Sequence, residues 1–309
     1  MPFSLAPRLG FIGAGRLARC LALGFARAGY PVTAVASRSG TAARDLAAAL
    51  DACRAAEDPQ QVVEAADIVF LATPDDSIGT IANTLQFDAA IARGARKALV
   101  HCSGATGLDV LTGAAAQGAL TGGFHPLFLF SGAATDVERI AGCSITIEAG
   151  NELAQALKTL ARSLSCHPLE IPAGERMLYH GAAHYAASFA LCALSEAVEL
   201  WRRLGLTEED TLRALLPMLT GTIEAAREKG LANALAGPVS RGDAALLQKQ
   251  LVCFEALGGD HAALYGLLTR RAVALARQRA NPPAALDAID RIVEEAIDRA
   301  LKVQAASKP

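Results

Sequence analysis

The chain has 309 residues, of which 52% are hydrophobic and 19% are charged, so it can bury a large core and is not a disordered protein. This length is typical of two domains rather than one. The formal net charge of −2 provides no basic surface of the kind that nucleic acids need, and we therefore expect no nucleic-acid partner.

The cysteines and the apolar segments indicate where the protein works. The seven cysteines are odd in number and include no Cys-x-x-Cys pair, so we expect neither a disulfide framework nor a zinc site. The N-terminal residues lack the basic and apolar regions of a signal peptide. The apolar stretch 182–194 is shorter than the about 20 residues that cross a bilayer. These features predict a cytoplasmic protein without a membrane partner.

The first half of the chain alternates between the patterns of strands and helices. The run DIVFLAT at 67–73 is apolar nearly throughout, which is typical of a parallel strand covered on both faces. Helices are expected at 16–28, at 41–50 and after the capping pair Asp58-Pro59. The alternation predicts βαβ units in a doubly wound sheet. Strands are expected at 8–12, 32–37, 67–73, 99–102, 120–124, 144–148 and 166–171.

The second half of the chain shows helical periods only, separated by glycine and proline residues. The pattern changes within residues 150–175. We therefore predict an α/β domain at 1–165, followed by an all-helical domain at 166–309. The expected helices span 174–204, 208–229, 243–257, 260–279 and 283–302.

A glycine-rich loop follows the first expected strand. The segment GFIGAGRLA at 10–18 contains G-x-G-x-x-A and opens a helix, the context that identifies a dinucleotide-binding loop. Gly13 allows a tight turn, Gly15 lets a pyrophosphate approach the backbone, and Ala18 lets the helix lie close to the strand. A purely structural turn is less favoured, because it needs only one glycine. We expect the phosphates at the start of the helix, against Gly13, Ala14, Gly15, Arg16 and Leu17.

The end of the second expected strand bears on the choice of cofactor. NAD-selective sites place an acidic residue there, and this chain has none. Ser37 can donate a hydrogen bond to a 2′-phosphate, and Arg38 can pair with it, which favours NADP(H) over NAD(H). A solvated arginine on a turn is the competing interpretation of Arg38.

The loop after the expected strand at 67–73 should face the same crevice, because ligands bind at the carboxyl ends of parallel strands. We expect Thr73 and Pro74 to lie along the nicotinamide ribose. Asp75 and Asp76 are interpreted as caps of a helix that starts near Ser77.

The ordered motifs GFIGAGRLA, SR, ADIVFLATPDDSI, LVHCSGAT and GGFHPLFLF resemble the N-terminal half of pyrroline-5-carboxylate reductases and β-hydroxyacid dehydrogenases. The second half is similar to the helical domain called DUF2520, through RMLYHGA at 176–182 and AGPVSRGD at 236–243. Together these pieces cover nearly the whole chain. The resemblance implies a Rossmann-like NAD(P)-binding domain and a homodimer formed through the helical domain, and it names no substrate.

Two positions depart from the pattern that the resemblance implies. Arg176 stands where related proteins commonly have Lys, and Ser188 stands where they commonly have Asn. In β-hydroxyacid dehydrogenases such residues serve the substrate, so both positions are candidates for substrate binding. An arginine cannot give up a proton near neutral pH, although it can clamp a carboxylate.

Reduction by hydride transfer also needs a group that protonates the product. Ser103 lies in a loop after a strand and could bind a carbonyl or carboxylate, or could simply close the turn. His125, followed by proline as in the similar prephenate dehydrogenases, is a second candidate, with a structural histidine as the alternative. His180 is the preferred general acid, because histidine titrates near the operating pH.

The remaining polar residues of the second half are a pair of histidines and the residues Arg241 and Asp243. His180 and His184 share the i, i+4 spacing of a metal site, but no Glu lies between them and no third ligand is evident, so no metal is expected. Arg241 could meet an anionic substrate or form an ion pair. Asp243 is interpreted as a helix cap.

These residues predict an NADP(H)-dependent oxidoreductase acting on a small carbonyl, imine, hydroxy acid or amino acid. A non-catalytic NADP(H)-binding sensor is the alternative, because fold and cofactor do not prove chemistry. A prephenate-like dehydrogenase is a weaker alternative.

Overall fold

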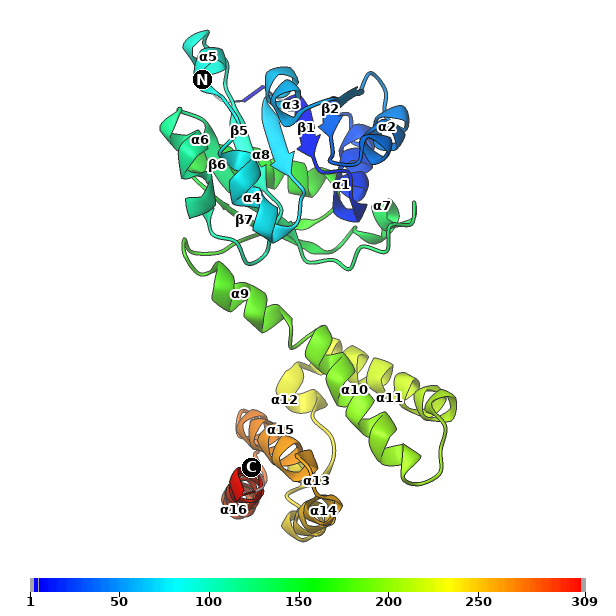
Figure 1. Ribbon diagram of the computed structural model, residues 1–309. Coiled ribbons are helices and arrows are strands. Elements are labelled where there is room, and N and C mark those ends of the chain that lie inside the picture. The colour runs from blue at the N-terminus through cyan, green and yellow to red at the C-terminus, as the bar shows by residue number, and fades with distance from the viewer. Residues whose placement is uncertain (1–2, 5, 307–309) are drawn as a thin grey trace. The chain divides into compact units, whose positions relative to one another are not determined.

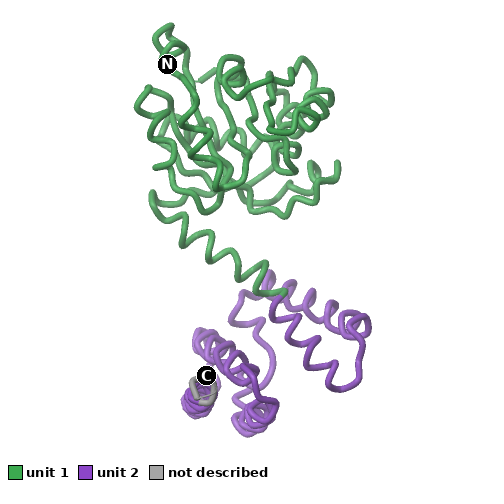
Figure 2. The backbone as a smooth tube through the Cα atoms, viewed as in Figure 1, with its two compact units in different colours: residues 1–191 green, residues 192–309 purple. Residues whose placement is uncertain are grey.

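The computed structural model describes residues 3–4 and 6–306. They form two compact units, residues 1–191 and 192–309 (Figure 2). The first unit extends beyond the expected boundary at residue 165, because it includes the last strand of the sheet and the helix that follows it. The division of the chain into functional domains at that boundary stays a prediction.

The first unit is built on one eight-stranded sheet of order β3-β2-β1-β4-β5-β6-β7-β8 (Figure 1). All neighbours are parallel except β6 and β7, which are antiparallel. The strand order reverses beside β1, which lies between β2 and β4, and this is the switch point where doubly wound sheets bind ligands. The predicted fold class is thus confirmed. The strands are β1 (Leu9–Ile12), β2 (Val32–Ala36), β3 (Arg54–Ala56), β4 (Ile68–Leu71), β5 (Ala98–His101), β6 (Leu120–Pro126), β7 (Ser144–Ala149) and β8 (His167–Glu170).

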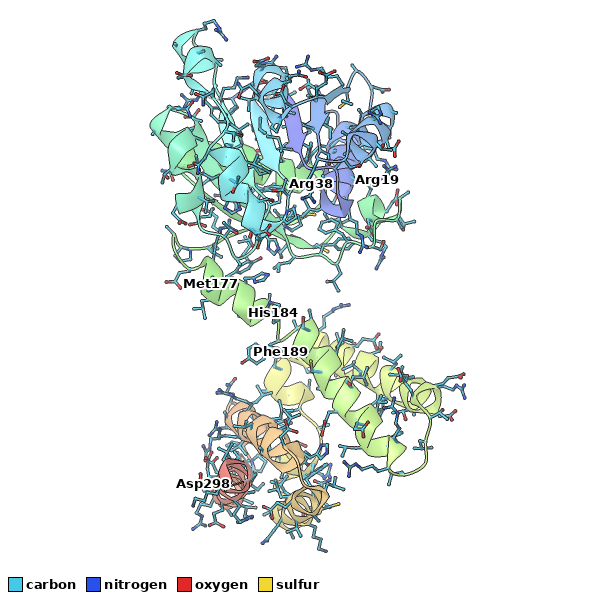
Figure 3. The ribbon with its side chains drawn as sticks, viewed as in Figure 1. Arg19, Arg38, Met177, His184, Phe189 and Asp298 are labelled. Carbon is cyan, nitrogen blue, oxygen red and sulfur yellow. The ribbon has the colours of Figure 1, made fainter. Side chains whose placement is uncertain are left out.

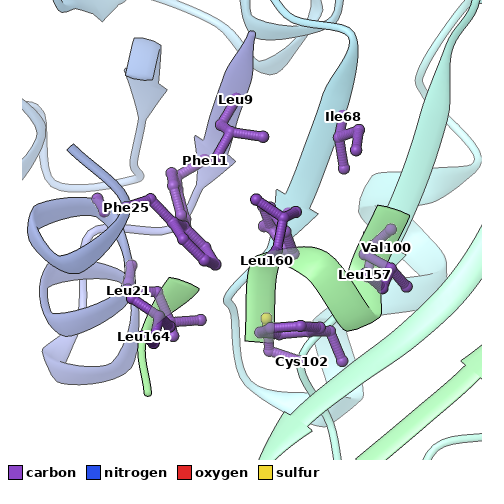
Figure 4. Close-up of a cluster of buried hydrophobic side chains, with 14 of the residues drawn as sticks. Leu9, Phe11, Leu21, Phe25, Ile68, Val100, Cys102, Leu157, Leu160 and Leu164 are labelled. Carbon is purple, nitrogen blue, oxygen red and sulfur yellow. The ribbon is translucent and has the colours of Figure 1, made fainter. Parts of the chain in front are cut away.

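Helices cover both faces of this sheet. On one face, α1 (Arg16–Arg27), α2 (Gly40–Ala48) and α8 (Asn151–Ser163) bury the core around Phe11, Phe25 and Leu157 that Figure 4 shows. On the other face, a second core joins α3 (Pro59–Ala65), α4 (Asp75–Ala82), η1 (Leu108–Leu111) and α6 (Thr112–Ala116). Burial on both faces explains why the central strands are apolar throughout. Two short helices, α5 (Asp88–Ala92) and α7 (Asp136–Arg139), lie in connections.

The sequence interpretation overlooked the short helices α5, η1, α6 and α7, and also β3 and α8. The strand β3 has only three residues, too few to show an alternating pattern. The helix α8 did carry a signal, since its buried residues Leu153, Leu157 and Leu160 recur at helical spacing.

The helix expected over 174–204 is not continuous, and this prediction is corrected. It divides into α9 (Arg176–Ala183) and α10 (Ser188–Arg202). Between them the backbone N–H groups of residues 184–187 each bond to the carbonyl three residues earlier, rather than four. This tighter turn interrupts the α-helix.

The second unit is helical. Its core joins α14, α15 and α16 around Leu251, Val273 and Ile289. Asp243 accepts a hydrogen bond from the backbone N–H of Leu246, which confirms its interpretation as the cap of α14. No described helix is long and apolar enough to cross a membrane. The further helices of this part of the chain are α11 (Glu208–Lys229), α12 (Leu231–Ala234), α13 (Pro238–Arg241), α14 (Ala244–Leu257), α15 (His261–Ala276) and α16 (Leu286–Ala306).

Candidate active site

A cavity of about 630 Å³ opens at the carboxyl ends of β1, β2 and β4. It lies at the reversal of strand order, so its position follows directly from the topology of the sheet. Seven of the nine residues predicted to bind the cofactor line it, and Arg16 and Leu17 lie in the adjoining first turn of α1. The lining comprises Ile12, Gly13, Ala14, Gly15, Ala36, Ser37, Arg38, Ser39, Glu57, Pro59, Ala72, Thr73, Pro74, Ser77 and Ile81.

The glycine loop has the geometry that a bound phosphate requires. Gly13 has a positive φ of 110°, and a Cβ atom there would collide with the carbonyl group of Ala72. A Cβ atom on Gly15 would meet nothing within 4 Å, so this position is open. No side chain caps the N-terminus of α1, and the N–H groups of its first turn are free to bind an anion. Arg16 lies against Gly132.

The end of the cavity next to β2 carries the residues that would contact the adenosine ribose. Ser37 and Arg38 follow β2, and the Arg38 side chain is exposed (Figure 3). Ser39, which the sequence interpretation did not include, lines the cavity and caps α2 by accepting a hydrogen bond from Ala42. Glu57 also lines this end, and only the short strand β3 before it could have indicated this. The basic group and the two hydroxyls suit a ribose that bears a phosphate.

Thr73 lies at the other end of the cavity, after β4. Its Oγ1 atom is buried and has no hydrogen-bond partner among the described residues. An orphaned buried hydroxyl of this kind is unusual unless a ligand completes it. The expectation that Asp75 and Asp76 cap a helix by their side chains is wrong. Both lie inside the first turn of α4, where the positive end of the helix dipole stabilises their negative charge.

A polar cluster lies beside this end of the cavity. β5 is paired with β4, so the Ser103-Gly104 loop and the Thr73-Pro74 loop leave the sheet from neighbouring strands. The rings of His125 and His180 have centroids 6.0 Å apart. Both rings face Gly104, where a Cβ atom would lie 2.6 Å from Cδ2 of His180 and 2.7 Å from Cε1 of His125. The structure therefore brings Ser103, His125 and His180 together.

The Ser103 side chain serves its own loop. Its Oγ accepts hydrogen bonds from the N–H groups of Ala105, at 3.2 Å, and Thr106, at 2.9 Å. This geometry favours the turn-closing interpretation of Ser103. The serine carbonyl oxygen accepts a hydrogen bond from Nη1 of Arg176 at 2.8 Å, which fixes the loop to α9.

Arg176 is the largest of the fully buried side chains. Its Nε donates to the carboxylate of Glu148 on β7 at 2.5 Å, while Nη2 has no partner among the described residues. Gly123 makes room for the guanidinium group, because a Cβ atom there would collide with Nη2. Arg176 therefore donates hydrogen bonds to two protein groups, and a role in binding a substrate carboxylate stays a prediction.

Burial keeps two histidines of this region, His101 and His125, uncharged. Burial, with smaller contributions from Arg176 and His125, lowers the pKa of His101 to about 3. Burial and the neighbouring His180 and Arg176 lower the pKa of His125 to about 4, against an opposing effect of Asp75. His101 was not singled out from the sequence, because it occupies an ordinary strand position.

The remaining candidates lie further along the chain. Ser188 is exposed at the start of α10, with its Oγ 3.3 Å from Nδ1 of His184. The rings of His180 and His184 meet edge to face, with centroids 4.9 Å apart. Among the described residues, no group of three or more potential ligands could hold a metal ion. Arg241 is exposed on α13, without an ion pair to any described residue, and its role stays a prediction.

Comparisons with known proteins agree with this architecture. Residues 5–126 match the model of a Rossmann-like domain, and residues 143–272 match the model of DUF2520, a domain of unknown function. The resemblance inferred from the motifs is confirmed. No curated protein sequence matches the chain.

Solved structures share the fold over most of the chain. A protein from Thermotoga maritima superimposes with a TM-score of 0.71 at 24% identity, over 87% of this chain and 98% of that one. A Bacteroides fragilis protein, provisionally named an NADP oxidoreductase, gives 0.62 at 25% identity, over 86% and 98%. A Plasmodium falciparum pyrroline carboxylate reductase with NADP bound gives 0.55 at 13% identity, over 95% and 98%.

Proposed function

We propose that this protein is an NADPH-dependent reductase of a small substrate with a C=O or C=N bond. One observation carries the proposal: Thr73 and Pro74 line the cavity of about 630 Å³ after β4, and on the neighbouring strand β5 the Gly104 loop meets the rings of His125 and His180. The open glycine loop and the orphaned Thr73 hydroxyl fit a dinucleotide. The similar structures named as an NADP oxidoreductase and as a pyrroline carboxylate reductase with NADP support the same chemistry.

Each part of the site has a distinct task under this proposal. The first turn of α1 binds the pyrophosphate through backbone N–H groups. Ser37 and Arg38 hold the 2′-phosphate, which makes NADPH preferred over NADH. Thr73 and Pro74 position the nicotinamide ribose. When bound, the nicotinamide supplies the hydride, and the side chains supply orientation and the proton.

His180 is the proposed general acid, since its ring lies against Gly104 beside His125. Replacing His180 with Ala should lower turnover at least tenfold, within the usual range for a lost general acid. Unchanged turnover would remove His180 from the mechanism.

The primary test is equilibrium binding of NADPH and NADH to the purified protein, measured side by side. We expect NADPH to bind at least tenfold more tightly, a difference of about 1.4 kcal/mol. A screen of ketones, keto acids and cyclic imines for NADPH oxidation then defines the substrate class. Failure to bind either nucleotide would contradict the proposal.

A non-catalytic NADPH-binding protein is the second candidate. The observation that favours it is Arg176, which occupies the position of a family lysine, cannot donate a proton, and is buried against Glu148. Tight NADPH binding without turnover of any compound in the same screen would select this function.

We also propose a homodimer formed through the helical residues. Large apolar side chains are exposed on α10, α11 and α15, including Leu191 at 67%, Met218 at 65% and Leu268 at 53%. Apolar surface of this extent is normally covered by a partner, and a second copy of the chain is the proposed one. Light scattering should give twice the monomer mass, and a clean monomer mass would contradict the dimer.

A further inference from the structure

Three side chains form a row of hydrogen bonds that the proposed mechanism has not yet used. They are His125, Tyr179 and Thr146. Nδ1 of His125, on β6, lies 3.0 Å from the phenolic oxygen of Tyr179, on α9. The same phenolic oxygen lies 2.5 Å from Oγ1 of Thr146, on β7. His125 and Thr146 are direct partners in the antiparallel pairing of β6 and β7, so the sheet fixes both end residues of this row of hydrogen bonds.

The hydroxyl protons can be placed by asking which arrangement satisfies each of them. Thr146 is fully buried, and Tyr179 is its only side-chain hydrogen-bond partner among the described residues. If Thr146 donates to Tyr179, then Tyr179 donates to Nδ1 of His125 and both hydroxyl protons are used. The opposite direction leaves the Thr146 proton buried without an acceptor, which is costly. Nδ1 is therefore the acceptor.

The charge states of the two rings agree with this direction. Burial lowers the pKa of His125 to about 4, with His180 and Arg176 adding to the effect and Asp75 opposing it. At neutral pH the imidazole therefore carries one proton. Burial raises the pKa of Tyr179, so its phenol keeps the proton that it donates. With Nδ1 occupied as an acceptor, the single imidazole proton lies on Nε2.

The Nε2 atom of His125 faces the Ser103-Gly104 loop. It lies 3.0 Å from the position that a Cβ atom on Gly104 would take, so a side chain at that position would crowd the ring. Nε2 makes no hydrogen bond to any described residue, and the ring is only partly buried. A neutral N–H donor is thus offered beside the end of the cofactor cavity.

We propose that Thr146 and Tyr179 hold His125 with its proton on Nε2, so that His125 donates a hydrogen bond to the acceptor oxygen or nitrogen of the substrate. This inference rests on the proposed reductase function. As a hydride adds to the substrate carbon, the π electrons move onto the acceptor atom, where the Nε2–H group stabilises the charge. The proton that completes the product comes from His180, and His125 keeps its own. Tyr179 and Thr146 are positioning residues.

The direct test is nitrogen-15 NMR of the whole protein with labelled histidine, because the nitrogen shifts distinguish the two neutral tautomers. The six histidines are assigned with the help of His125→Gln. At pH 7 we expect Nδ1 of His125 unprotonated and Nε2 protonated. In Tyr179→Phe, which keeps the ring but removes the hydroxyl, the two tautomers should become mixed. A protonated Nδ1 in the wild type would overturn the inference without touching cofactor binding.

Two further variants separate positioning from general damage. Thr146→Val removes the terminal hydroxyl and should shift the His125 tautomer in the same direction as Tyr179→Phe. Tyr185→Phe is the control, because Tyr185 is 73% exposed in the turn after α9, and it should leave the His125 resonances unchanged. An unchanged tautomer in both Tyr179→Phe and Thr146→Val would overturn the role of the hydroxyl chain.

Kinetics with a substrate from the screen completes the test. Tyr179→Phe should lower kcat/KM about tenfold, the effect of losing one hydrogen bond that orients the His125 ring. His125→Gln keeps an N–H donor and should retain more activity than His125→Leu. If His125 had to transfer its proton to the substrate, glutamine could not replace it, and the two variants would lose the same activity. Equal loss in the two variants would overturn the donor role. Absence of NADPH binding, with the tautomer as expected, would instead contradict the proposed function.

Discussion

Gly123 on β6 lies directly against the guanidinium group of Arg176 on α9, and any Cβ atom at position 123 would overlap Nη2 of that arginine. A glycine in a strand interior weakens the strand, and it is found where another group must approach closely. Here the approaching group is a buried cation paired with Glu148. The pair therefore ties the start of α9 to the sheet, and the same helix brings Tyr179 to His125 and Thr146 and brings His180 to Gly104.

Gly123→Ala should destabilise the first unit, because the added methyl group displaces the guanidinium. We expect the free energy of unfolding to fall by about 1–3 kcal/mol, as in other overpacked sites. Chemical denaturation followed by circular dichroism measures the change. Gly181→Ala is the control, since a Cβ atom there meets nothing within 4 Å. Equal effects of the two substitutions would contradict the steric explanation.

Arg176→Met should cost more, because it leaves the carboxylate of Glu148 buried without its cation. Breaking a buried ion pair by removing one partner typically costs about 3–5 kcal/mol. Arg96→Met removes the partner of Glu152 in an ion pair that is well exposed, and it should cost less than about 1 kcal/mol. A small loss in Arg176→Met, comparable with that of Arg96→Met, would show that the buried pair contributes little.

Acid should destabilise the protein partly through His101. Its pKa in the folded protein is about 3, below the ordinary value of 6.5, so the unfolded chain binds the proton more readily. The contribution to stability is complete above about pH 6.5 and is lost as the pH falls toward 3, by up to about 1.4 kcal/mol per pH unit. Between pH 6 and pH 4, His101→Leu should flatten the dependence of unfolding free energy on pH. His167→Gln, on the exposed surface of β8, is the control. Parallel curves for wild type and His101→Leu would contradict this account.

Arg38→Ala should weaken NADPH binding at least tenfold and leave NADH binding nearly unchanged, because only NADPH presents a 2′-phosphate to the guanidinium. Arg44→Ala removes a nearby positive charge on α2 from outside the cavity, and it should have little effect on either nucleotide. Isothermal titration with both nucleotides provides the comparison. If NADPH and NADH weaken equally in Arg38→Ala, the arginine does not select between them.

The elements of the first unit could be predicted from the sequence wherever short stretches carry their own signal. The strand–glycine–helix succession at 8–28 follows from local rules: apolar residues make the strand, and two glycines make the turn. Where the local signal is short, as for β3, or where a tight turn interrupts a helical pattern, as at 184–187, the sequence interpretation was incomplete.

The sequence by itself determined the glycine loop and the buried parallel strands, because each depends on residues a few positions apart. Only the tertiary structure decided the contents of the polar cluster. Arg176 meets Glu148 and Ser103 across 28 and 73 positions, and Tyr179 meets His125 across 54. Such contacts are set by the pairing of β6 with β7 and by the course of α9. No local pattern encodes them, since burial and hydrogen bonding between distant residues arise only when the whole sheet has formed.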